Sequence, residues 1–363
     1  MRFIDLQAQY LAYREAIDEA VQEVMQSACF INGPQVAKLE AELARFVGVD
    51  HAVGYSSGTD GLLAVLMAWG IAPGDEIITT PFTFIATAEV IALLGAKPVF
   101  VDVDPESLNL DPVQLAAAIT ARTRAIMPVN LYGQCADWDA IQAVASQHGL
   151  LSLEDGCQSF GAVYRGRRSG SLGTAGVTSF FPAKPFGCGG DGGMVFTNDG
   201  ALAERLRVIR EHGQVARYQH AVLGFNGRLD TLQAAIMLAK WPHFEAEIAA
   251  RQRVADYYRS RLAGRVRLPV SLPDQLSVYA QFTIRTTQRE AVQHHLTAAG
   301  IPTAIHYPAP LHRQPVFAHL GHRPEAFPVA AQAAQEVLSL PMHPFLTTDE
   351  QDRVVDALLA ILP

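Results

Sequence analysis

The sequence has few cysteines and no long hydrophobic run. Four cysteines, Cys29, Cys135, Cys157 and Cys188, are spread over the chain, and no two of them form a CxxC pair. This spacing predicts neither a structural zinc site nor a disulfide framework. No apolar stretch reaches the roughly 18 residues that a membrane-spanning helix needs, and residues 1–10 lack the basic start and apolar core of a signal peptide. We therefore expect a cytoplasmic protein without a membrane segment.

Charge is also scarce. Charged residues make up 18% of the chain and the formal net charge is −8, so no basic surface for nucleic acid is indicated. None of the 12 histidines falls in an HExxH spacing, and we expect no metal site. Hydrophobic residues account for 49% of the 363 residues. A chain of this length and composition exceeds one compact core, so we expect a large domain and a smaller one.

The stretch richest in reactive groups is residues 151–193, LSLEDGCQSFGAVYRGRRSGSLGTAGVTSFFPAKPFGCGGDGG. Asp155 follows an apolar run, so it should lie at the carboxyl end of a buried strand, where open α/β sheets bind their ligands. Lys184 lies between Pro182 and Pro185, which favour an extended loop over a helix interior. A lysine held in this way is presented to a ligand.

Four side chains of this stretch suit pyridoxal phosphate. Lys184 supplies an amine that can bond to the cofactor aldehyde, and Asp155 supplies a carboxylate for the pyridinium nitrogen. Gln158 and Ser179 add hydrogen-bonding groups for the ring and the phosphate. Taken singly, an aspartate after a strand is more often a cap or turn residue, and a loop lysine is usually solvated. The prediction therefore depends on the combination.

A competing motif lies in the same stretch. GCGGDG, residues 187–192, formally matches the glycine fingerprint of dinucleotide-binding sites. That fingerprint requires a strand before the glycines and a helix after them. No strand immediately precedes this motif, and the MVFTND that follows it predicts a strand. We therefore do not expect a NAD site.

Seven short apolar or β-branched runs predict the strands of one sheet. They are residues 52–56, 76–80, 98–103, 124–129, 150–154, 176–181 and 194–197. Helical or turn segments separate them, which indicates a mainly parallel, doubly wound α/β sheet. Apolar residues at helical spacing predict helices over 11–25, 33–49 and 242–263. The last of these should lead from a large domain, 1–241, into a small α+β domain, 242–363, with a strand at 277–286 and a helix at 289–299.

The turn SSGTDG opens one of the predicted helices directly after the first strand. Exposed backbone amides at a helix start bind phosphate well. Gly58 and Thr59 are therefore candidate phosphate ligands. The alternative is a plain capping turn.

The segments SFFPAKPFGCGGDGG and EDGCQSFGA resemble the active-site signature of the DegT/DnrJ/StrS nucleotide-sugar aminotransferases, and the similarity extends from FIDLQAQY to SLPMHPFL. The resemblance implies an aspartate-aminotransferase-like fold (PLP fold type I) and a PLP-dependent transaminase. Within the family, the chain is most similar to enzymes that aminate UDP-2-acetamido-2-deoxy-3-oxo-glucuronate for surface polysaccharides such as the lipopolysaccharide O-antigen. L-Glutamate is the implied amino donor.

The resemblance also implies which residues bind the cofactor. Phe84, in PFTFIATAE, matches the aromatic residue that stacks on the ring, although an aromatic at such a place is more often a core residue. Gln158 would hydrogen-bond the hydroxyl side of the ring. Thr59 and Ser179 would hold the phosphate, together with Asn226 of the partner subunit. The shared phosphate site implies a homodimer.

Three further residues are implied to bind substrates. Arg228, in the motif that begins with Asn226, would reach into the partner subunit's site and bind carboxylates with its planar fork. The alternative for Arg228 is a surface ion pair. His306 and Tyr307, in HYPAPLH, match family positions near the sugar.

Several alternatives stay open at this stage. The motif residues do not separate this substrate from C4-keto sugars, dTDP-linked sugars or inosose-like rings. A regulator that binds the cofactor or a nucleotide sugar without turnover is a further alternative. Related dehydratases have histidine in place of Lys184, so its presence favours the transaminase. Gly156 and Cys157, where the family commonly has two alanines, and Phe186, where it has leucine, are small apolar departures.

Overall fold

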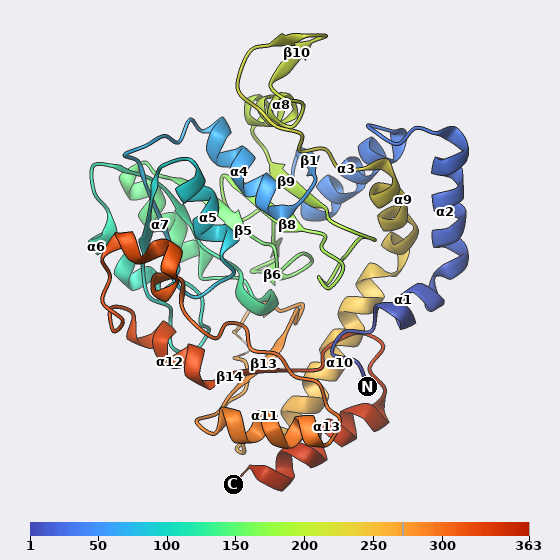
Figure 1. Cartoon of the computed structure of the whole chain (residues 1–363), viewed down its shortest axis with the longest axis vertical. Coiled ribbons are helices and arrows are strands. Elements are labelled where there is room, and N and C mark those ends of the chain that lie inside the picture. Colours follow the sequence, from blue (N-terminus) through green and yellow to red (C-terminus); the bar gives the residue numbers. More distant parts are fainter. Residues whose placement is uncertain (271, 363) are drawn as a thin grey trace.

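The computed structural model describes residues 1–270 and 272–362. Its central strands are β1 (His51–Tyr55), β2 (Glu76–Thr79), β3 (Lys97–Phe100), β4 (Thr123–Met127), β5 (Leu151–Asp155), β8 (Ala175–Ser179) and β9 (Gly193–Thr197). They form one seven-stranded sheet in the order β1-β9-β8-β5-β4-β2-β3 (Figure 1). All neighbours are parallel except β9, which is antiparallel to β1 and β8. The predicted seven-stranded, mainly parallel sheet is confirmed.

Helices cover both faces of this sheet. The helices α4 (Gly58–Ala68), α5 (Ala86–Leu93) and α8 (Gly200–Ile209) supply one hydrophobic core, and α3 (Pro34–Val47), α7 (Trp138–His148) and α9 (Thr231–Lys240) supply the other. Because successive strand residues point to opposite faces, Ile77 belongs to the first core and Ile78 to the second. Burial on both faces explains why the strands are continuous apolar runs.

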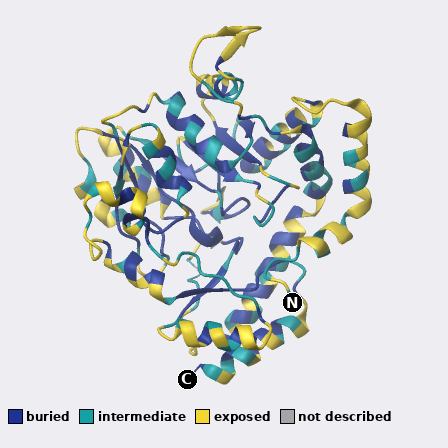
Figure 2. Ribbon diagram, in the orientation of Figure 1, coloured by how far each residue is buried: buried dark blue, intermediate teal, exposed yellow. Residues whose placement is uncertain are grey.

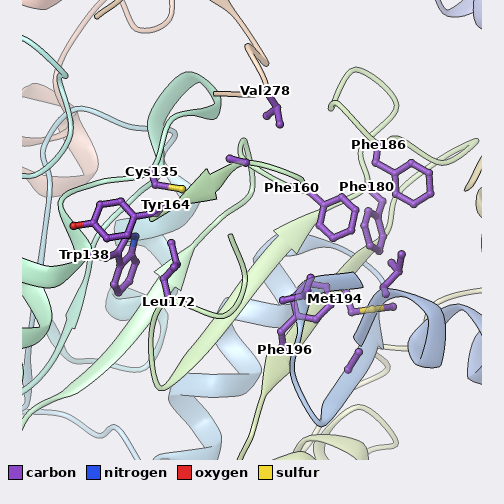
Figure 3. Close-up of a cluster of buried hydrophobic side chains, with 14 of the residues drawn as sticks. Cys135, Trp138, Phe160, Tyr164, Leu172, Phe180, Phe186, Met194, Phe196 and Val278 are labelled. Atoms are coloured by element: carbon purple, nitrogen blue, oxygen red, sulfur yellow. The ribbon is translucent and has the colours of Figure 1, made fainter. Parts of the chain in front are cut away.

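An aromatic cluster joins the two loops that carry the chemistry of the 151–193 stretch. The Phe160 ring centroid lies 5.3 to 6.1 Å from the centroids of five other phenylalanines. Figure 3 shows Phe160 beside Phe180, Phe186 and Phe196. Phe160 follows β5 and Asp155, whereas Phe180 and Phe186 flank Lys184. Packing of these rings therefore sets the two loops relative to each other.

The C-terminal region has a core of its own. Helix α10 (Phe244–Leu262) leads to β13 (Phe282–Arg285), α11 (Arg289–Ala298), β14 (Val337–Leu340) and α13 (Thr348–Ile361), and the two strands pair antiparallel. Phe244 and Ile248 of α10 pack into the core of the large sheet, whereas Val254 and Tyr258 pack into the C-terminal core. The division at residues 241 and 242 stays a prediction.

The N-terminal helix differs from the prediction. A single helix over 11–25 was expected, but α1 (Leu6–Ala12) and α2 (Arg14–Ser27) are separated at Tyr13. Tyr13 has non-helical angles, φ −120° and ψ 18°, and its ring stacks on His243 with centroids 4.2 Å apart. A contact with a residue far along the chain therefore overrides the local helical pattern.

The remaining elements are short or lie near the surface. They are α6 (Leu115–Ala118), α12 (Pro328–Glu336), β6 (Val163–Tyr164), β7 (Arg167–Arg168), β10 (Gln214–Ala216), β11 (Gln219–His220), β12 (Gln275–Leu276) and five 3₁₀ turns. A strand was predicted at 277–286, but β13 covers only Phe282–Arg285. Val278 instead donates its N–H to the Gly133 carbonyl. The β10–β11 hairpin protrudes from the body and is exposed (Figure 2). Within the described residues, no helix has the length and apolarity to cross a bilayer.

Candidate functional site

A cavity of about 640 Å³ lies at the carboxyl ends of the central strands. The residues that follow β1, β2, β5 and β8 form one side of it, which is where open α/β sheets bind ligands. Gln281, Ala304 and His306 of the C-terminal region form part of the opposite side, together with Phe3 and Ile4. The cavity therefore lies between segments that are far apart in the sequence.

Most of the residues predicted from the sequence as site residues meet in this cavity. Those that line it are Gly58, Thr59, Phe84, Asp155, Gln158, Ser179, Lys184, His306 and Tyr307. Asn226 and Arg228 do not line the cavity of their own chain. The individual roles assigned to these residues stay predictions.

The start of α4 forms one end of the cavity. Ser57 caps the helix, because its hydroxyl accepts a hydrogen bond from the Asp60 N–H at 3.0 Å. The first-turn amides of Gly58 and Thr59 have no intrahelical partner, so they are available to an anion. A Cβ on Gly58 would lie 2.7 Å from Cys157 Sγ and 2.9 Å from Ser179 Cβ. Close packing of these segments therefore requires glycine at this position.

Lys184 occupies a tight turn in the cavity wall. The loop is confirmed, but it is not extended as predicted, because the Lys184 N–H donates to the Phe181 carbonyl at 2.8 Å. Two residues of α9 hold this loop: the buried Lys240 amine donates to the Gly187 carbonyl, and the side-chain oxygen Oε1 of Gln233 accepts from the Gly189 N–H. The Lys184 amine is thereby presented to the cavity from a fixed backbone.

The electrostatic environment of Lys184 suits an amine that reacts. Burial lowers the pKa of Lys184 below the usual lysine value, and the nearby Cys157 and Asp155 oppose this shift. A lower pKa increases the neutral fraction of the amine, which is the nucleophilic form. Among the described residues, Lys184 Nζ has no ion-pair partner within 4.0 Å.

Asp155 ends β5 and is almost fully buried, with 4% of its surface exposed. Its Oδ2 accepts a hydrogen bond from Thr87 Oγ1 at 2.7 Å, and its Oδ1 accepts one from the Cys157 N–H at 3.2 Å. A buried carboxylate held by two donors keeps a defined orientation. It places a negative charge on the wall of the same cavity that Lys184 lines.

Gln158 connects the two sides of the cavity. Its Oε1 accepts from the Tyr132 N–H at 2.9 Å, and its Nε2 donates to the Tyr307 hydroxyl at 3.2 Å. The Tyr132 hydroxyl in turn donates to the His306 carbonyl. These bonds join the loops after β4 and β5 to the C-terminal segment that carries His306 and Tyr307. Tyr132 was not predicted from the sequence, because the segment after β4 in which it lies has no charged side chain that would point to a site.

His306 and Tyr307 present neutral polar groups to the cavity. Burial lowers the pKa of His306, and the positive charge of Lys184 lowers it further. His306 Nδ1 lies 2.9 Å from Ser339 Oγ. Burial raises the pKa of Tyr307, so its hydroxyl stays protonated at neutral pH. Both side chains can therefore orient an uncharged sugar ring by hydrogen bonds.

These groups fit pyridoxal phosphate, the cofactor predicted from the sequence. The α4 start and Ser179 suit the phosphate, Asp155 suits a protonated ring nitrogen, and Lys184 suits the aldehyde. Phe84 lines the same cavity with 56% of its surface exposed, which is unusual for a phenylalanine and leaves a ring face available for stacking.

Further lining residues were not predicted. They are Phe3, Ile4, Ser57, Leu62, Thr83, Ala86, Thr87, Cys157, Phe181, Ala183, Asp191, Gln281 and Ala304. Thr83 and Thr87 carried a signal that could have found them, since they follow β2 just as Asp155 ends β5. Residues such as Gln281 and Phe3 carried none, because only the tertiary fold brings them to the cavity.

Asn226 and Arg228 lie on a segment that passes beside the start of α4. The Gly227 carbonyl accepts a hydrogen bond from the Ser56 N–H at 2.9 Å. Asn226 is exposed. Arg228 Nη1 forms an ion pair with Glu211 Oε2 at 2.9 Å. Within one chain, Arg228 therefore makes the ion pair that the sequence analysis gave as its alternative role.

Comparison with known proteins gives consistent matches over nearly the whole chain. Residues 12–359 match the DegT/DnrJ/EryC1/StrS aminotransferase family. The chain is 53% identical over 349 residues, 96% of each protein, to the UDP-2-acetamido-2-deoxy-3-oxo-D-glucuronate aminotransferase of Pseudomonas aeruginosa. It is 46% identical over 352 residues, 97% of this chain and 95% of the relative, to the UDP-N-acetyl-3-dehydro-alpha-D-glucosamine 3-aminotransferase of Acidithiobacillus ferrooxidans.

A solved structure supports the same comparison. The crystal structure of NtdA from Bacillus subtilis, with bound cofactor PMP, superimposes with a TM-score of 0.92 at 30% identity. The superposition covers 99% of this chain and 84% of that one. The α/β fold with a seven-stranded, mostly parallel sheet is therefore shared with a protein that binds an aminated form of the predicted cofactor.

Proposed function

Because the chain belongs to the DegT/DnrJ/EryC1/StrS aminotransferase family, whose members depend on pyridoxal phosphate, we propose that it aminates C3 of UDP-2-acetamido-2-deoxy-3-oxo-glucuronate. L-Glutamate is the proposed donor, and the 3-amino sugar would enter surface polysaccharide such as the lipopolysaccharide O-antigen. The proposed site of action is the cytoplasm. One observation supports the chemistry above all: a single cavity brings together an amine of lowered pKa, a buried carboxylate and a helix start.

The residues that would hold the cofactor follow from this cavity. When bound, pyridoxal phosphate supplies a carbon that carries the amino group and a ring that accepts electrons. Gly58, Thr59 and Ser179 are positioned to bind the phosphate, and Asp155 to pair with the ring nitrogen. Phe84 offers a ring face. Together these residues would hold the cofactor in the cavity that Lys184 also lines.

Lys184 is the proposed proton carrier of the reaction. Its lowered pKa allows the amine to be neutral in a larger fraction of molecules, so it can accept a proton from the donor Cα. With pyridoxal phosphate bound, Lys184 would hold this proton in the cavity that the cofactor shares. Lys240 and Gln233 hold the loop of Lys184, which keeps the amine in place during this proton movement.

The charges in the cavity support a homodimer with shared sites. The lining residues include Asp155 and Asp191, whereas Lys184 and His306 are the only lining side chains that can carry positive charge. The cofactor phosphate, a dicarboxylate donor and a nucleotide diphosphate are all anions. Arg228 of the partner subunit would supply the missing cation. The exposed β10–β11 hairpin, with Tyr218 at 79% exposure, and Leu223 just after it, at 88%, offer apolar contacts for a second copy.

Arg228 is also the proposed source of selectivity for a uronate. The two relatives described above differ in that one is named for a glucuronate and the other for a glucosamine. Among the described residues of one chain, no arginine lines the cavity to bind the C6 carboxylate. The guanidinium fork of Arg228 could bind that carboxylate with two parallel hydrogen bonds. Glu211, its partner in the same chain, would share the cation in the absence of substrate.

Absorbance of the bound cofactor tests this proposal. L-Glutamate should abolish the absorbance band of the Lys184-bound cofactor. After removal of free glutamate, the 3-keto uronate should restore the band faster than its neutral 3-keto counterpart. Arg228→Ala should slow the uronate step about 30-fold or more, from the roughly 2 kcal/mol lost with such a charge pair, and leave the neutral sugar nearly unchanged.

The control and the contrary outcomes are specific. Arg124→Ala removes a surface ion pair of similar length, 2.8 Å to Asp75, and should change neither rate. Equal losses for both sugars would refute the role of Arg228 in selectivity. If only a different keto sugar restored the band, the proposed substrate would be wrong and the aminotransferase activity would stand. No response to glutamate would favour the regulator.

A further inference from the structure

We propose that Thr83 and Thr87 form a chain of two hydroxyl groups that positions Asp155 for the ring nitrogen of the cofactor. Thr87 lies in the first turn of α5, and its Oγ1 donates to Asp155 Oδ2 at 2.7 Å. Thr83 Oγ1 lies 3.2 Å from Thr87 Oγ1. Thr83 and Thr87 follow β2 and Asp155 ends β5, with β4 between these two strands, and 68 positions separate Thr87 from Asp155.

The direction of the chain follows from the charge of its last member. A carboxylate only accepts hydrogen bonds, so the Thr87 hydroxyl proton must point to Asp155. The Thr87 oxygen then has only lone pairs to offer to Thr83. Thr83 is therefore the donor of the second bond. Each donor polarises the next, which strengthens both bonds in a buried setting.

Burial strengthens the effect of this chain of hydroxyl groups on the orientation of Asp155. Thr83 is 2% exposed and Thr87 is 1% exposed, so water does not replace the Thr87 hydroxyl on Asp155 Oδ2 or the Thr83 hydroxyl on Thr87. The other donor to Asp155 is the backbone N–H of Cys157, which bonds Oδ1. Thr87 is thus the side chain that sets the rotation of the carboxylate. A carboxylate free to rotate would pair less well with the ring nitrogen.

The test measures cofactor binding by the apoprotein, titrated with pyridoxal phosphate alone. Thr87→Val keeps the shape and removes the hydroxyl, and it should raise the dissociation constant about tenfold or more. Thr87→Ser keeps the hydroxyl and should restore binding to within about threefold. Thr83→Val should weaken binding about two- to threefold, and it should have no further effect in a protein that already carries Thr87→Val.

Thr79→Val is the matched control. Thr79 is also a fully buried threonine of the same segment, but its hydroxyl donates to the Met127 carbonyl at 2.7 Å. It should leave the dissociation constant unchanged. Unchanged binding by Thr87→Val, or failure of Thr87→Ser to restore it, would overturn the proposal.

The other outcomes are also decisive. A persistent effect of Thr83→Val in the Thr87→Val background would overturn the chain, because Thr83 would then act on the cofactor directly. If Thr87→Val does not fold, Thr83→Val alone tests the proposal. Wild-type affinity of Thr83→Val for pyridoxal phosphate would then overturn the chain of hydroxyl groups. The inference needs only cofactor binding, so its failure would leave the proposed sugar substrate untouched.

Discussion

Gly161→Ala tests how packing beneath the site controls the loop after Asp155. Gly161 follows Phe160 and has φ +92°, a conformation that side chains other than glycine rarely adopt. A Cβ there would lie 2.6 Å from Ile248 Cδ1 and 3.0 Å from Phe244 Cζ. Both neighbours belong to α10 and are buried. The loop can therefore approach α10 only without a side chain at this position.

The expected cost has two parts. The left-handed backbone costs an alanine about 1–2 kcal/mol, and overpacking of a close-packed core costs about 1–3 kcal/mol. The Ile248 methyl group ends a flexible side chain and can shift. The Phe244 ring cannot, because it packs 5.3 Å from Phe160 and 4.8 Å from Phe186. We expect Gly161→Ala to lower the free energy of unfolding by about 3 kcal/mol.

Urea unfolding of the apoprotein measures this cost and separates its parts. Gly166→Ala is the control, because Gly166 has φ +78° and nothing within 4 Å of the position of a Cβ. It should show the backbone cost alone. Ile248→Val removes Cδ1 and should cost about 0.5–1.5 kcal/mol in the wild type, but less in the Gly161→Ala background. Equal costs for the two glycines, or no relief from Ile248→Val, would refute the packing argument.

Two further changes test other features of the structure. His343 is 2% exposed, and burial together with the Arg251 cation lowers its pKa in the folded protein. The unfolded chain therefore binds more protons than the folded one. Stability should fall as the pH drops below about 6.5, the ordinary histidine pKa, toward the lowered pKa of the folded protein. His343→Leu should lose less stability than the wild type between about pH 7 and pH 5, as measured by urea midpoints, and equal losses would contradict this assignment. Phe84→Ala should raise the dissociation constant of pyridoxal phosphate about tenfold, since a stacked aromatic contributes area and ring interactions. The same change should alter apoprotein unfolding by less than about 0.5 kcal/mol because the ring is exposed; unchanged affinity would refute stacking by Phe84.

The sequence alone determined the features that depend on local patterns. The apolar runs predicted every strand of the large sheet, because a strand covered on both faces must be continuously apolar. Asp155 was placed at a strand end and Lys184 on a loop for the same kind of reason. Gly58, Asp155 and Ser179 were expected to bind the same cofactor, and the three residues line one cavity. These inferences required only neighbours in sequence.

Only the tertiary structure decided the contacts between residues distant in sequence. Tyr13 interrupts a helix because its ring stacks on His243, and Thr87 bonds Asp155 across two strand ends. Arg228 pairs within its own chain with Glu211, a partner that no motif indicated. Local propensities are worth tenths of a kcal/mol per residue, whereas a buried hydrogen bond to a charge or a buried ring contributes more. Where the two compete, the long-range contact prevails, and it is visible only once the chain has folded.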